Sequence, residues 1–427
     1  MTSPGGHMPT PSLWRDRRFR TAWSAQTVSE FGDRITELAL PLIAVTMLNA
    51  SPSQVGLLTA AVWLPNLLGL FIGSWVDQRQ DKRRLMIAAD LARTVLLLSL
   101  PVAYWLDLLG LGQLYTIAIL AGLADVVFSA GYATFFVRLV AREQYLEANS
   151  KFSATRSLSF MGGPAIGGAL MQWLTAPIAM IVDAASFAFS AFQLSRVKAD
   201  PGPADDDVPE PFLTRVRSGM RYVLTHPYLK GSLGCATTVN FFTMMSSALI
   251  VLYASRELSL PAGTIGLAFG IGAAGGLLGA IAATPLSRIF GAGPVVAAGT
   301  IVFPGGIAIA VLADGPLWAR AATLAAAEFV MAFAVMCFDV PLNAIQAAVV
   351  DDNLRSRVYG AFSSINYGVR PLGAVVGGFL GTWIGVRETI LVSATGGLFA
   401  VLWLIRSPIL KTRDLESLRP PQHTEQS

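Results

Sequence analysis

The sequence predicts an all-α membrane protein with twelve transmembrane helices in two pseudo-symmetric six-helix halves. The first observation is composition: 53% of the 427 residues are hydrophobic, only 14% are charged, and the mean hydropathy is +0.56. Soluble domains carry about 25% charged residues. Secondly, twelve spans of about 21 residues would occupy about 250 positions, which leaves no room for a sizeable soluble catalytic domain. The third observation is an internal repeat of about half the chain.

Apolar runs that are long enough to cross a bilayer follow one another along the chain. Short segments rich in Arg, Asp, Pro or Gly separate them. The predicted spans cover residues 19–48, 53–76, 85–106, 113–137, 157–176, 177–195, 229–253, 262–284, 293–313, 317–340, 359–384 and 389–406.

The basic residues predict the orientation of these spans. Most of the 31 Lys and Arg residues fall in alternate loops on the side of the N-terminus, for example in segments 15–20 and 79–84. The loops of the opposite side hold Arg256, Arg320 and Arg387. By the positive-inside rule we expect a multi-pass protein of the inner or plasma membrane with both termini in the cytoplasm. The polar stretch before Trp14 has no apolar core, so no cleaved signal peptide is expected.

The repeat becomes visible when the sequence is shifted against itself by about 210 residues. The shift places Gly56 on Gly266, Gly69 on Gly279, Gly167-Gly168 on Gly377-Gly378, and Arg196 on Arg406. The predicted division is an N-terminal six-helix half at 1–198, a cytoplasmic linker with a surface helix at 199–230, a C-terminal six-helix half at 231–412 and a cytoplasmic tail at 413–427. Parallel halves of this kind are typical of secondary transporters, which bind substrate near the bilayer midplane between the halves.

The segment 199–211 reads ADPGPADDDVPEP and has no apolar periodicity, so it is expected to be a linker. After it, apolar residues recur at helical spacing: Phe212, Val216, Met220 and Val223. This pattern predicts either a short amphipathic helix on the anionic inner leaflet or a solvated connector.

Ionisable residues inside the spans are candidates for function, because inserting each one costs roughly 2.5–3.5 kcal/mol. In the first span Glu30, Asp33 and Glu37 share one helix face, which is expected to line the substrate cavity. Arg34 follows Glu30 by one turn, so these two are expected to pair. Asp33 and Glu37 have no such partner and are expected to share and carry a proton, since two adjacent carboxylates cannot both stay ionised cheaply. The alternative is that this part of the span is merely wetted.

Other spans contain fewer charges. Asp125 is the only charged residue well inside the fourth span. Glu328 stands alone in the tenth span, and Arg370 in the eleventh is its expected cross-helix partner. Asp90 and Arg93 are one turn apart and are expected to form a structural pair. Two weaker candidates near span ends are Asp183 and Asp339.

The loop after the second span reads Gly73-Ser-Trp-Val-Asp77-Gln-Arg79-Gln-Asp-Lys82-Arg83-Arg84. It resembles the signature between helices 2 and 3 of the major facilitator superfamily, which has a Gly, three intervening residues, an Asp and a basic cluster. The resemblance implies that Gly73 allows close helix packing and that Asp77, with Arg83 and Arg84, forms a conformational latch facing helix 11. The alternative is a plain positive-inside loop.

The fifth span contains Gly162-Gly163-Pro164-Ala-Ile-Gly167-Gly168. It resembles the Gly-Pro-x-x-Gly-Gly signature of drug and proton antiporters in the same superfamily. The resemblance implies a helix-packing motif made of Gly163, Pro164, Gly167 and Gly168, with the glycines of the eighth span, Gly270 to Gly275, as its partner. Ordinary packing of small residues is the alternative.

Further motifs extend the resemblance over nearly the whole chain: Leu40-Pro41-Leu42, Met86-Ile-Ala-Ala-Asp90, Glu147-Ala-Asn149-Ser150 and Arg370-Pro371-Leu372-Gly373. They look like the macrolide-efflux and enterobactin-exporter branch of the superfamily. The resemblance implies a secondary active exporter of amphipathic small molecules, such as a drug, antibiotic or siderophore, driven by inward protons through alternating access. The arginine that many drug antiporters carry in the fourth span is absent.

Several other functions are not supported by the sequence. It has no P-loop pattern and no cavity Ser-His or metal-ligand set, so an ATP-driven pump, an enzyme, a cofactor and a metal site are not expected. Cys235 and Cys337 lie in apolar runs and are expected to pack as small apolar residues. The expected partners of this monomeric chain are a small-molecule substrate, protons and the lipid bilayer, without nucleic acid. An importer or lipid flippase of the same fold, or a non-transporting membrane sensor, remains an alternative.

Overall fold

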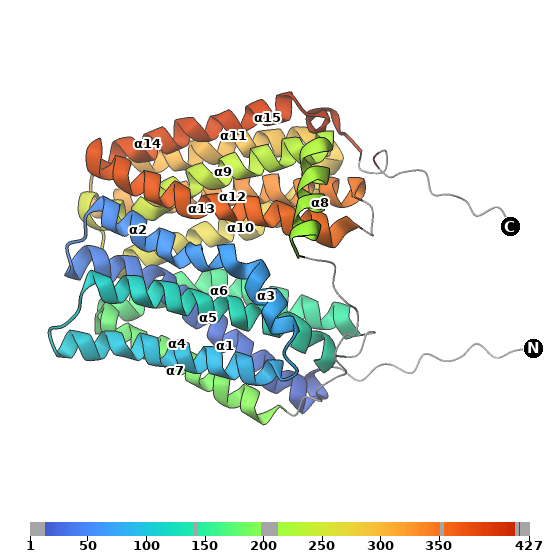
Figure 1. The fold of residues 1–427 in the computed structure, drawn as a ribbon. Coiled ribbons are helices and arrows are strands. Elements are labelled where there is room, and N and C mark those ends of the chain that lie inside the picture. Colours follow the sequence, from blue (N-terminus) through green and yellow to red (C-terminus); the bar gives the residue numbers. More distant parts are fainter. Residues whose placement is uncertain (1–12, 141–143, 198–211, 351–353, 415–417, 419–427) are drawn as a thin grey trace, which may run out of the picture.

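The computed structural model describes residues 13–140, 144–197, 212–350, 354–414 and 418, and the regular elements within these ranges are helices. The long helices lie side by side in one bundle (Figure 1). The first and last helices have their outer ends at the same end of the bundle, where α8 (Phe212–Thr225) also lies. We name this end the terminus side and the opposite end the far side.

The bundle is assembled from the following elements. Before the linker they are η1 (Leu13–Arg15), α1 (Arg17–Leu42), η2 (Ile43–Met47), α2 (Pro52–Trp63), η3 (Leu64–Leu68), α3 (Gly69–Asp77), α4 (Lys82–Trp105), α5 (Leu111–Leu139), α6 (Tyr145–Leu174) and α7 (Ala176–Arg196). After α8 they are α9 (Pro227–Leu252), η5 (Tyr253–Glu257), α10 (Ala262–Phe290), α11 (Ala292–Val311), α12 (Leu317–Val349), α13 (Arg355–Trp383), α14 (Val386–Gly397), η7 (Leu398–Ala400), α15 (Val401–Ile405) and η8 (Pro408–Lys411).

Within the described residues, 8 helical segments are long and apolar enough to cross a membrane. They are Lys82–Trp105, Leu111–Tyr132, Ala176–Arg196, Pro227–Glu257, Ala262–Phe290, Ala292–Val311, Leu317–Val349 and Val386–Ile405. The remaining predicted spans fall outside this group for visible reasons. The α1 helix contains several charges, the second span is divided, and α6 and α13 are rich in glycine and polar residues.

Some helices differ in extent from the predicted spans. The second predicted span is interrupted at Leu64–Leu68, a 3-10 turn that contains Pro65, because proline cannot donate a helical hydrogen bond. The fifth begins at Tyr145 instead of residue 157, and the tenth continues to Val349 instead of residue 340. Hydropathy marks the apolar part of a helix, whereas the helix itself can extend into water on polar turns.

The repeat seen in the sequence recurs in local backbone geometry. The π-helical turns Ile43–Met47 and Tyr253–Glu257 lie at the same offset of about 210 residues. Each is followed by a residue with a left-handed backbone, Asn49 with φ 49° and Ser259 with φ 51°. The two parts of the chain therefore leave their first long helix through the same unusual turn.

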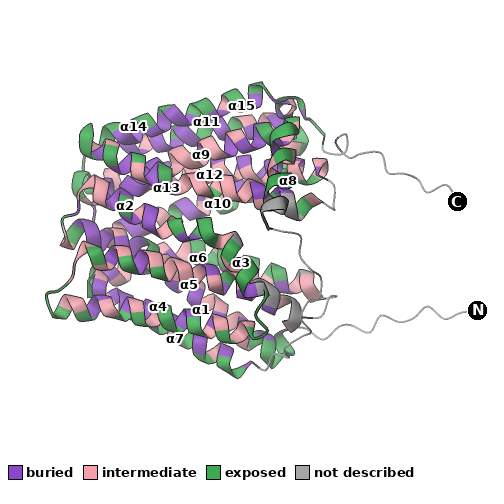
Figure 2. Ribbon diagram, viewed as in Figure 1, coloured by how far each residue is buried: buried purple, intermediate pink, exposed green. Residues whose placement is uncertain are grey.

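The surface of the bundle carries large apolar side chains. Figure 2 shows buried residues between the helices and exposed ones along the outside. Exposed members include Trp173, Leu267, Phe379 and Trp383. Such continuous apolar exposure suits a lipid environment.

Helix α8 begins at Phe212, directly after the linker, in agreement with the helical alternative. Its Val223 is fully buried against Leu229, Leu233 and Val358, which belong to α9 and α13. This part of its apolar face therefore packs against protein and not against the inner leaflet. The side chains from Phe212 to Val216 lie outside the described residues.

Candidate functional site

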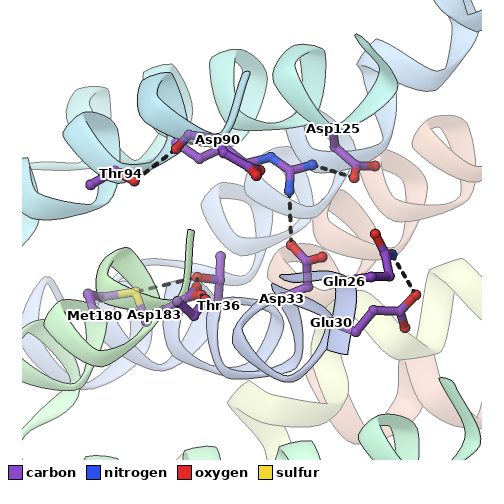
Figure 3. Close-up of polar contacts among 11 residues, drawn as sticks. Gln26, Glu30, Asp33, Thr36, Asp90, Thr94, Asp125, Met180 and Asp183 are labelled. Carbon is purple, nitrogen blue, oxygen red and sulfur yellow. Dashed lines mark hydrogen bonds and ion pairs between the residues drawn. The ribbon is translucent and has the colours of Figure 1, made fainter. Parts of the chain in front are cut away.

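A buried arginine in α4 forms the centre of a charged cluster between helices. Figure 3 labels the two acids that it contacts, Asp33 and Asp125. Arg93 is only 2% exposed, and its Nη2 donates a hydrogen bond to Oδ1 of Asp125 in α5. Its Nη1 lies 3.6 Å from Oδ1 of Asp33 in α1. The guanidinium also stacks on aromatic rings, with its Cζ 4.8 Å from the ring centre of Phe187 and 5.7 Å from that of Phe128. One arginine thus connects α1, α4, α5 and α7.

The two carboxylates of this cluster are not buried with the arginine. The side chain of Asp33 is 39% exposed and that of Asp125 is 50% exposed. Both stand midway along their helices, so they combine a central position in the bundle with access to a mobile ion or a ligand. The predicted candidates Asp33 and Asp125 are therefore brought together by Arg93, a residue that was predicted to form only a structural pair with Asp90.

The expected pair of Asp90 with Arg93 is wrong. Asp90 is fully buried, and its carboxylate lies beside the Ser190 hydroxyl of α7 instead of forming an ion pair with Arg93. The arginine instead extends away from its own helix to α1 and α5. The Asp90 backbone carbonyl accepts a hydrogen bond from Thr94 Oγ1 at 2.8 Å, and the same hydroxyl lies 3.4 Å from the Ala184 carbonyl of α7.

The carboxylate of Asp183 in α7 lies between two helices, and hydroxyl groups donate hydrogen bonds to it. It is fully buried and accepts hydrogen bonds from Thr36 in α1 and, at 3.1 Å, from Ser186. Gly32 lies directly against Asp183, where any side chain would collide with the carboxylate. Asp183 therefore holds α1 and α7 together.

The other acids of α1 pair differently from the expectation. Arg34 Nη1 lies 2.6 Å from Glu37 Oε2, not against Glu30. Glu30 accepts a hydrogen bond from Gln26 at 3.0 Å and lies 3.6 Å from Arg156 of α6. The expectation that Glu37 lacks a local partner is therefore wrong. The Arg34–Glu37 pair lies within α1, whereas Glu30 contacts an exposed arginine of α6. Asp33 is the acid of this face that contacts a buried arginine of another helix.

In the second part of the chain, the expected pair of Glu328 and Arg370 is also wrong. Arg370 Nε donates to Asn240 Oδ1 in α9 at 2.8 Å, and its guanidinium stacks on Trp63 and Tyr367. Glu328 instead lines a cavity of about 20 Å³ together with Ser246 and Ser247, among others. That volume is enough for a single water molecule.

The glycines of α6 contact two different partners. Gly163 packs on Arg34 and Gly167 on Ile35, both in α1. Gly168 faces α10, where a Cβ would lie 2.7 Å from the Ala262 carbonyl oxygen and 2.9 Å from Gly266 Cα. The carbonyl of Pro164 also lies against Gly266. The eighth span therefore meets α6 through Gly266 and through the expected Gly270, where a Cβ would lie 2.9 Å from the Met161 carbonyl oxygen. The expected Gly275 packs on Phe329 of α12 instead.

The contact between α6 and α10 has a counterpart between α2 and α13. A Cβ at Gly56 would lie 2.6 Å from Gly378 Cα. Hydrogen bonds accompany both contacts: Ser53 N donates to Thr382 Oγ1 at 3.0 Å, and Gly263 N donates to Gln172 Oε1 at 2.9 Å. All these residues lie near the far-side ends of their helices. We define them as the far-side seam: Ser53, Gly56, Gln172, Gly168, Gly263, Gly266, Gly378 and Thr382.

The loop motif on the terminus side adopts a different arrangement from the expected one. A Cβ at Gly73 would meet no described atom within 4 Å, so this glycine makes no close helix contact here. Arg83 Nη1 donates to the Val197 carbonyl at 2.6 Å, just beyond α7, and Arg84 pairs with Asp81 at 2.8 Å. The side chain of Asp77 lies outside the described residues.

Metal-binding groups are not found in the described part of the chain, where no three His, Cys, Asp or Glu residues converge. Cys235 and Cys337 are buried free thiols. Asn240 and Trp63, which contact Arg370, were not among the predicted site residues, because an Asn or a Trp inside an apolar run carries no signal that it faces a particular arginine.

The chain resembles known transporters over nearly its full length. The family described as transmembrane secretion effector matches residues 10–426. The multidrug efflux pump Tap of Mycolicibacterium fortuitum is 26% identical over 402 residues, which cover 90% of this chain and 94% of that protein. The uncharacterized MFS-type transporter YfiS of Bacillus subtilis is 25% identical, with 90% and 92% covered.

Solved structures share the fold at lower identity. A bacterial homologue of the iron transporter ferroportin, in an inward-facing state, superposes with a TM-score of 0.73 at 16% identity and covers 91% of this chain and 98% of its own. A bacterial homologue of the human lysosomal transporter Spinster, also inward-facing, gives 0.72 at 13% identity, with 95% and 99% covered. The chain therefore belongs to the transmembrane secretion effector family of major facilitator superfamily transporters.

Proposed function

We propose that this chain is a secondary active exporter of amphipathic small molecules that exchanges its substrate for protons. The observation that carries the proposal is the shared arginine: Arg93 is buried, whereas its partners Asp33 and Asp125 are partly exposed. Protonation of either carboxylate removes its attraction to Arg93. The cluster can therefore exist in states that differ both by one proton and by one contact between helices. The multidrug efflux pumps among the relatives support a drug-like substrate.

The candidate residues take different roles in this proposal. Asp33 and Asp125 carry the proton. Arg93 contacts both, so a change in their charge alters the packing of α1, α4 and α5. Glu30 and Glu37 line the substrate cavity with their charges already paired. Glu328, beside its small cavity, is a second proton-binding candidate.

We further propose that α1, α6, α13 and the broken α2–η3–α3 segment also cross the membrane. This gives twelve spans in two halves, at 1–198 and 231–412, joined by a cytoplasmic linker at 199–230 and followed by a cytoplasmic tail at 413–427. The basic loops of the terminus side support its placement in the cytoplasm, with both chain ends, in an inner or plasma membrane. The protein acts as a monomer.

Transport follows from alternating access between the two halves. The far-side seam supports a state in which the outer side is closed. Gly73, with free space around it, supports an open terminus side. Rocking of the halves would bring a helix against Gly73, where Asp77 and Arg83 could act as the latch, while the seam separates.

Reconstituted protein tests this function directly. Proteoliposomes with an acidified lumen and trapped pyranine would receive ethidium, rhodamine 6G or dansyl-glycine from outside. We expect at least one compound to accumulate and to release protons from the lumen, and we expect both effects to stop when nigericin collapses the gradient. Movement of compound and protons in the same direction would indicate an importer instead. Absence of coupled flux for all three compounds would contradict the proposal.

A further inference from the structure

Arg370 has no carboxylate partner within ion-pair distance in the part of the chain that the structure describes. It stands about midway along α13 (Arg355–Trp383), where an unpaired cation is costly in a membrane. Asp339 is close enough to attract it but forms no ion pair with it. A cation kept at this depth without a counter-ion is a candidate for binding one from a ligand.

The guanidinium of Arg370 is held in one orientation. Its Nε donates to Asn240 Oδ1 at 2.8 Å. Asn240 is itself fixed, because its Nδ2 donates to Asn366 Oδ1 at 3.0 Å and to the Ala236 carbonyl at 3.1 Å. Two aromatic rings cover the group, with Cζ 4.3 Å from the ring centre of Trp63 and 4.4 Å from that of Tyr367. These contacts reduce the entropy that Arg370 would lose on binding a ligand.

The remaining edge of the guanidinium makes no hydrogen bond with the residues that the structure describes. This edge consists of Nη1 and Nη2, for which the described residues offer no acceptor. Because these two nitrogens are not among the buried atoms that lack a hydrogen bond, both reach accessible surface. This edge can give two parallel N–H bonds to the oxygens of one carboxylate. The aromatic rings beside it offer apolar surface to the rest of such a molecule.

We propose that Arg370 binds the oxyanion of an amphipathic carboxylic acid or zwitterion, while Trp63 and Tyr367 contact the apolar part of the same molecule. This inference rests on the proposed export function and names its substrate class. Trp63 belongs to the first half and Arg370 to the second, so the bound molecule touches both halves. A zwitterion could in addition present its cation to the acids of the first half, Asp33 and Asp125.

A matched pair of probes tests the carboxylate preference. Dansyl-glycine and dansyl-glycinamide differ only in the charged group, and fluorescence reports their binding to purified protein in phosphatidylcholine nanodiscs. We expect the wild type to bind the carboxylate about tenfold more tightly, the difference that a charge-assisted hydrogen bond supplies. Arg370→Gln should bind both probes alike, with unchanged affinity for the amide. Arg288→Gln, at an exposed position, should keep the full preference.

Several results would overturn the inference. One is that the wild type binds the two probes equally, or binds neither. Another is that Arg370→Gln keeps the preference for the carboxylate. If Arg370→Gln does not fold, Arg370→Lys takes its place: it keeps the charge but loses the two parallel N–H bonds, and should lose most of the preference. Unchanged dansyl-glycine binding after addition of phosphatidylglycerol is expected, whereas its displacement would assign Arg370 to a lipid headgroup instead.

The nanodisc measurement involves no proton gradient, so it is independent of the coupling experiment. Failure of coupled flux with an intact carboxylate preference would contradict only the antiport function. Coupled flux without the preference would contradict only the substrate class.

Discussion

Nη1 of Arg93 lies 3.6 Å from Oδ1 of Asp33 across the contact between α4 and α1. The same guanidinium donates through Nη2 to Asp125 of α5. Arg93 is almost fully buried, whereas Asp33 and Asp125 are partly exposed. The arginine is therefore the fixed part of the cluster, and the two carboxylates are the groups that can exchange protons with their surroundings. The position of α1 relative to α4 and α5 therefore depends on the charge of two accessible carboxylates.

Replacing Arg93 by Gln should destabilise the protein strongly. The change leaves Asp33 and Asp125 near each other without their cation, and removing one member of a buried ion pair costs about 3–5 kcal/mol. Since both acids are partly exposed, we expect a loss nearer to about 2 kcal/mol. Thermal unfolding in detergent measures it against Arg288→Gln, which should unfold like the wild type.

The double variant Arg93→Gln, Asp125→Asn provides the control for this interpretation. It should recover part of the lost stability, because it no longer contains one of the two uncompensated carboxylates. Strict additivity of the two single changes would show that the contact is not energetically coupled.

Replacing Gly168 by Leu should open the far-side seam. Its Cβ would lie 2.7 Å from the Ala262 carbonyl and 2.9 Å from Gly266 Cα, so α6 and α10 must separate. Gly305→Leu in α11 is the matched control, because a side chain there meets no described atom within 4 Å and the position belongs neither to the seam nor to the loop motif. A cysteine placed at Ser53 reports the change through an impermeant maleimide applied from the far side. Labelling should rise several-fold with Gly168→Leu and stay unchanged with Gly305→Leu, and equal labelling of the two would remove the seam assignment.

The orientation of the chain can be tested at two exposed positions. Leu108 lies in the far-side loop after α4, and Arg288 lies at the terminus-side end of α10. The distribution of basic residues predicts that a cysteine at 108 reacts with impermeant reagent in intact cells, whereas one at 288 reacts only in inverted vesicles. The opposite pattern would reverse the assigned topology.

Local sequence rules recovered the helices better than the contacts between them. The turn at Ser51 could be predicted, since Ser51 and Gln54 form a capping box and Pro52 is the first residue of α2. The early start of α6 could not, because its first turns are polar and leave no hydropathy signal. Apolar runs therefore locate the membrane-embedded part of each helix without fixing its ends.

The candidate site shows the same limit for side chains. Residue spacing identifies only neighbours on one helix. It therefore predicted Asp90 as the partner of Arg93, and Glu30 as the partner of Arg34. The actual partners, Asp125 and Glu37, depend on helix packing and on which of two adjacent turns the side chain reaches. Acid positions could thus be predicted from the sequence, whereas their pairing needed coordinates.

The two acids of α1 should differ sharply in transport. Asp33→Asn removes a carboxylate that contacts Arg93 from another helix, so the cluster loses one of its protonation states. Glu37→Gln removes a more exposed group whose partner, Arg34, lies one turn away on the same helix at 2.6 Å. In proteoliposomes, Asp33→Asn should lower gradient-driven accumulation of a transported compound about tenfold or more while retaining downhill exchange, since substrate can still bind when the coupling step is lost. Glu37→Gln should stay within about twofold of the wild type, because a half-exposed ion pair contributes about 1 kcal/mol or less.

The pH dependence of accumulation separates the roles further: it should flatten in Asp33→Asn and Asp125→Asn and persist in Glu37→Gln. If Asp33→Asn and Asp125→Asn both keep the wild-type pH profile, the proton is carried elsewhere, and Glu328 beside its water-sized cavity becomes the residue to replace.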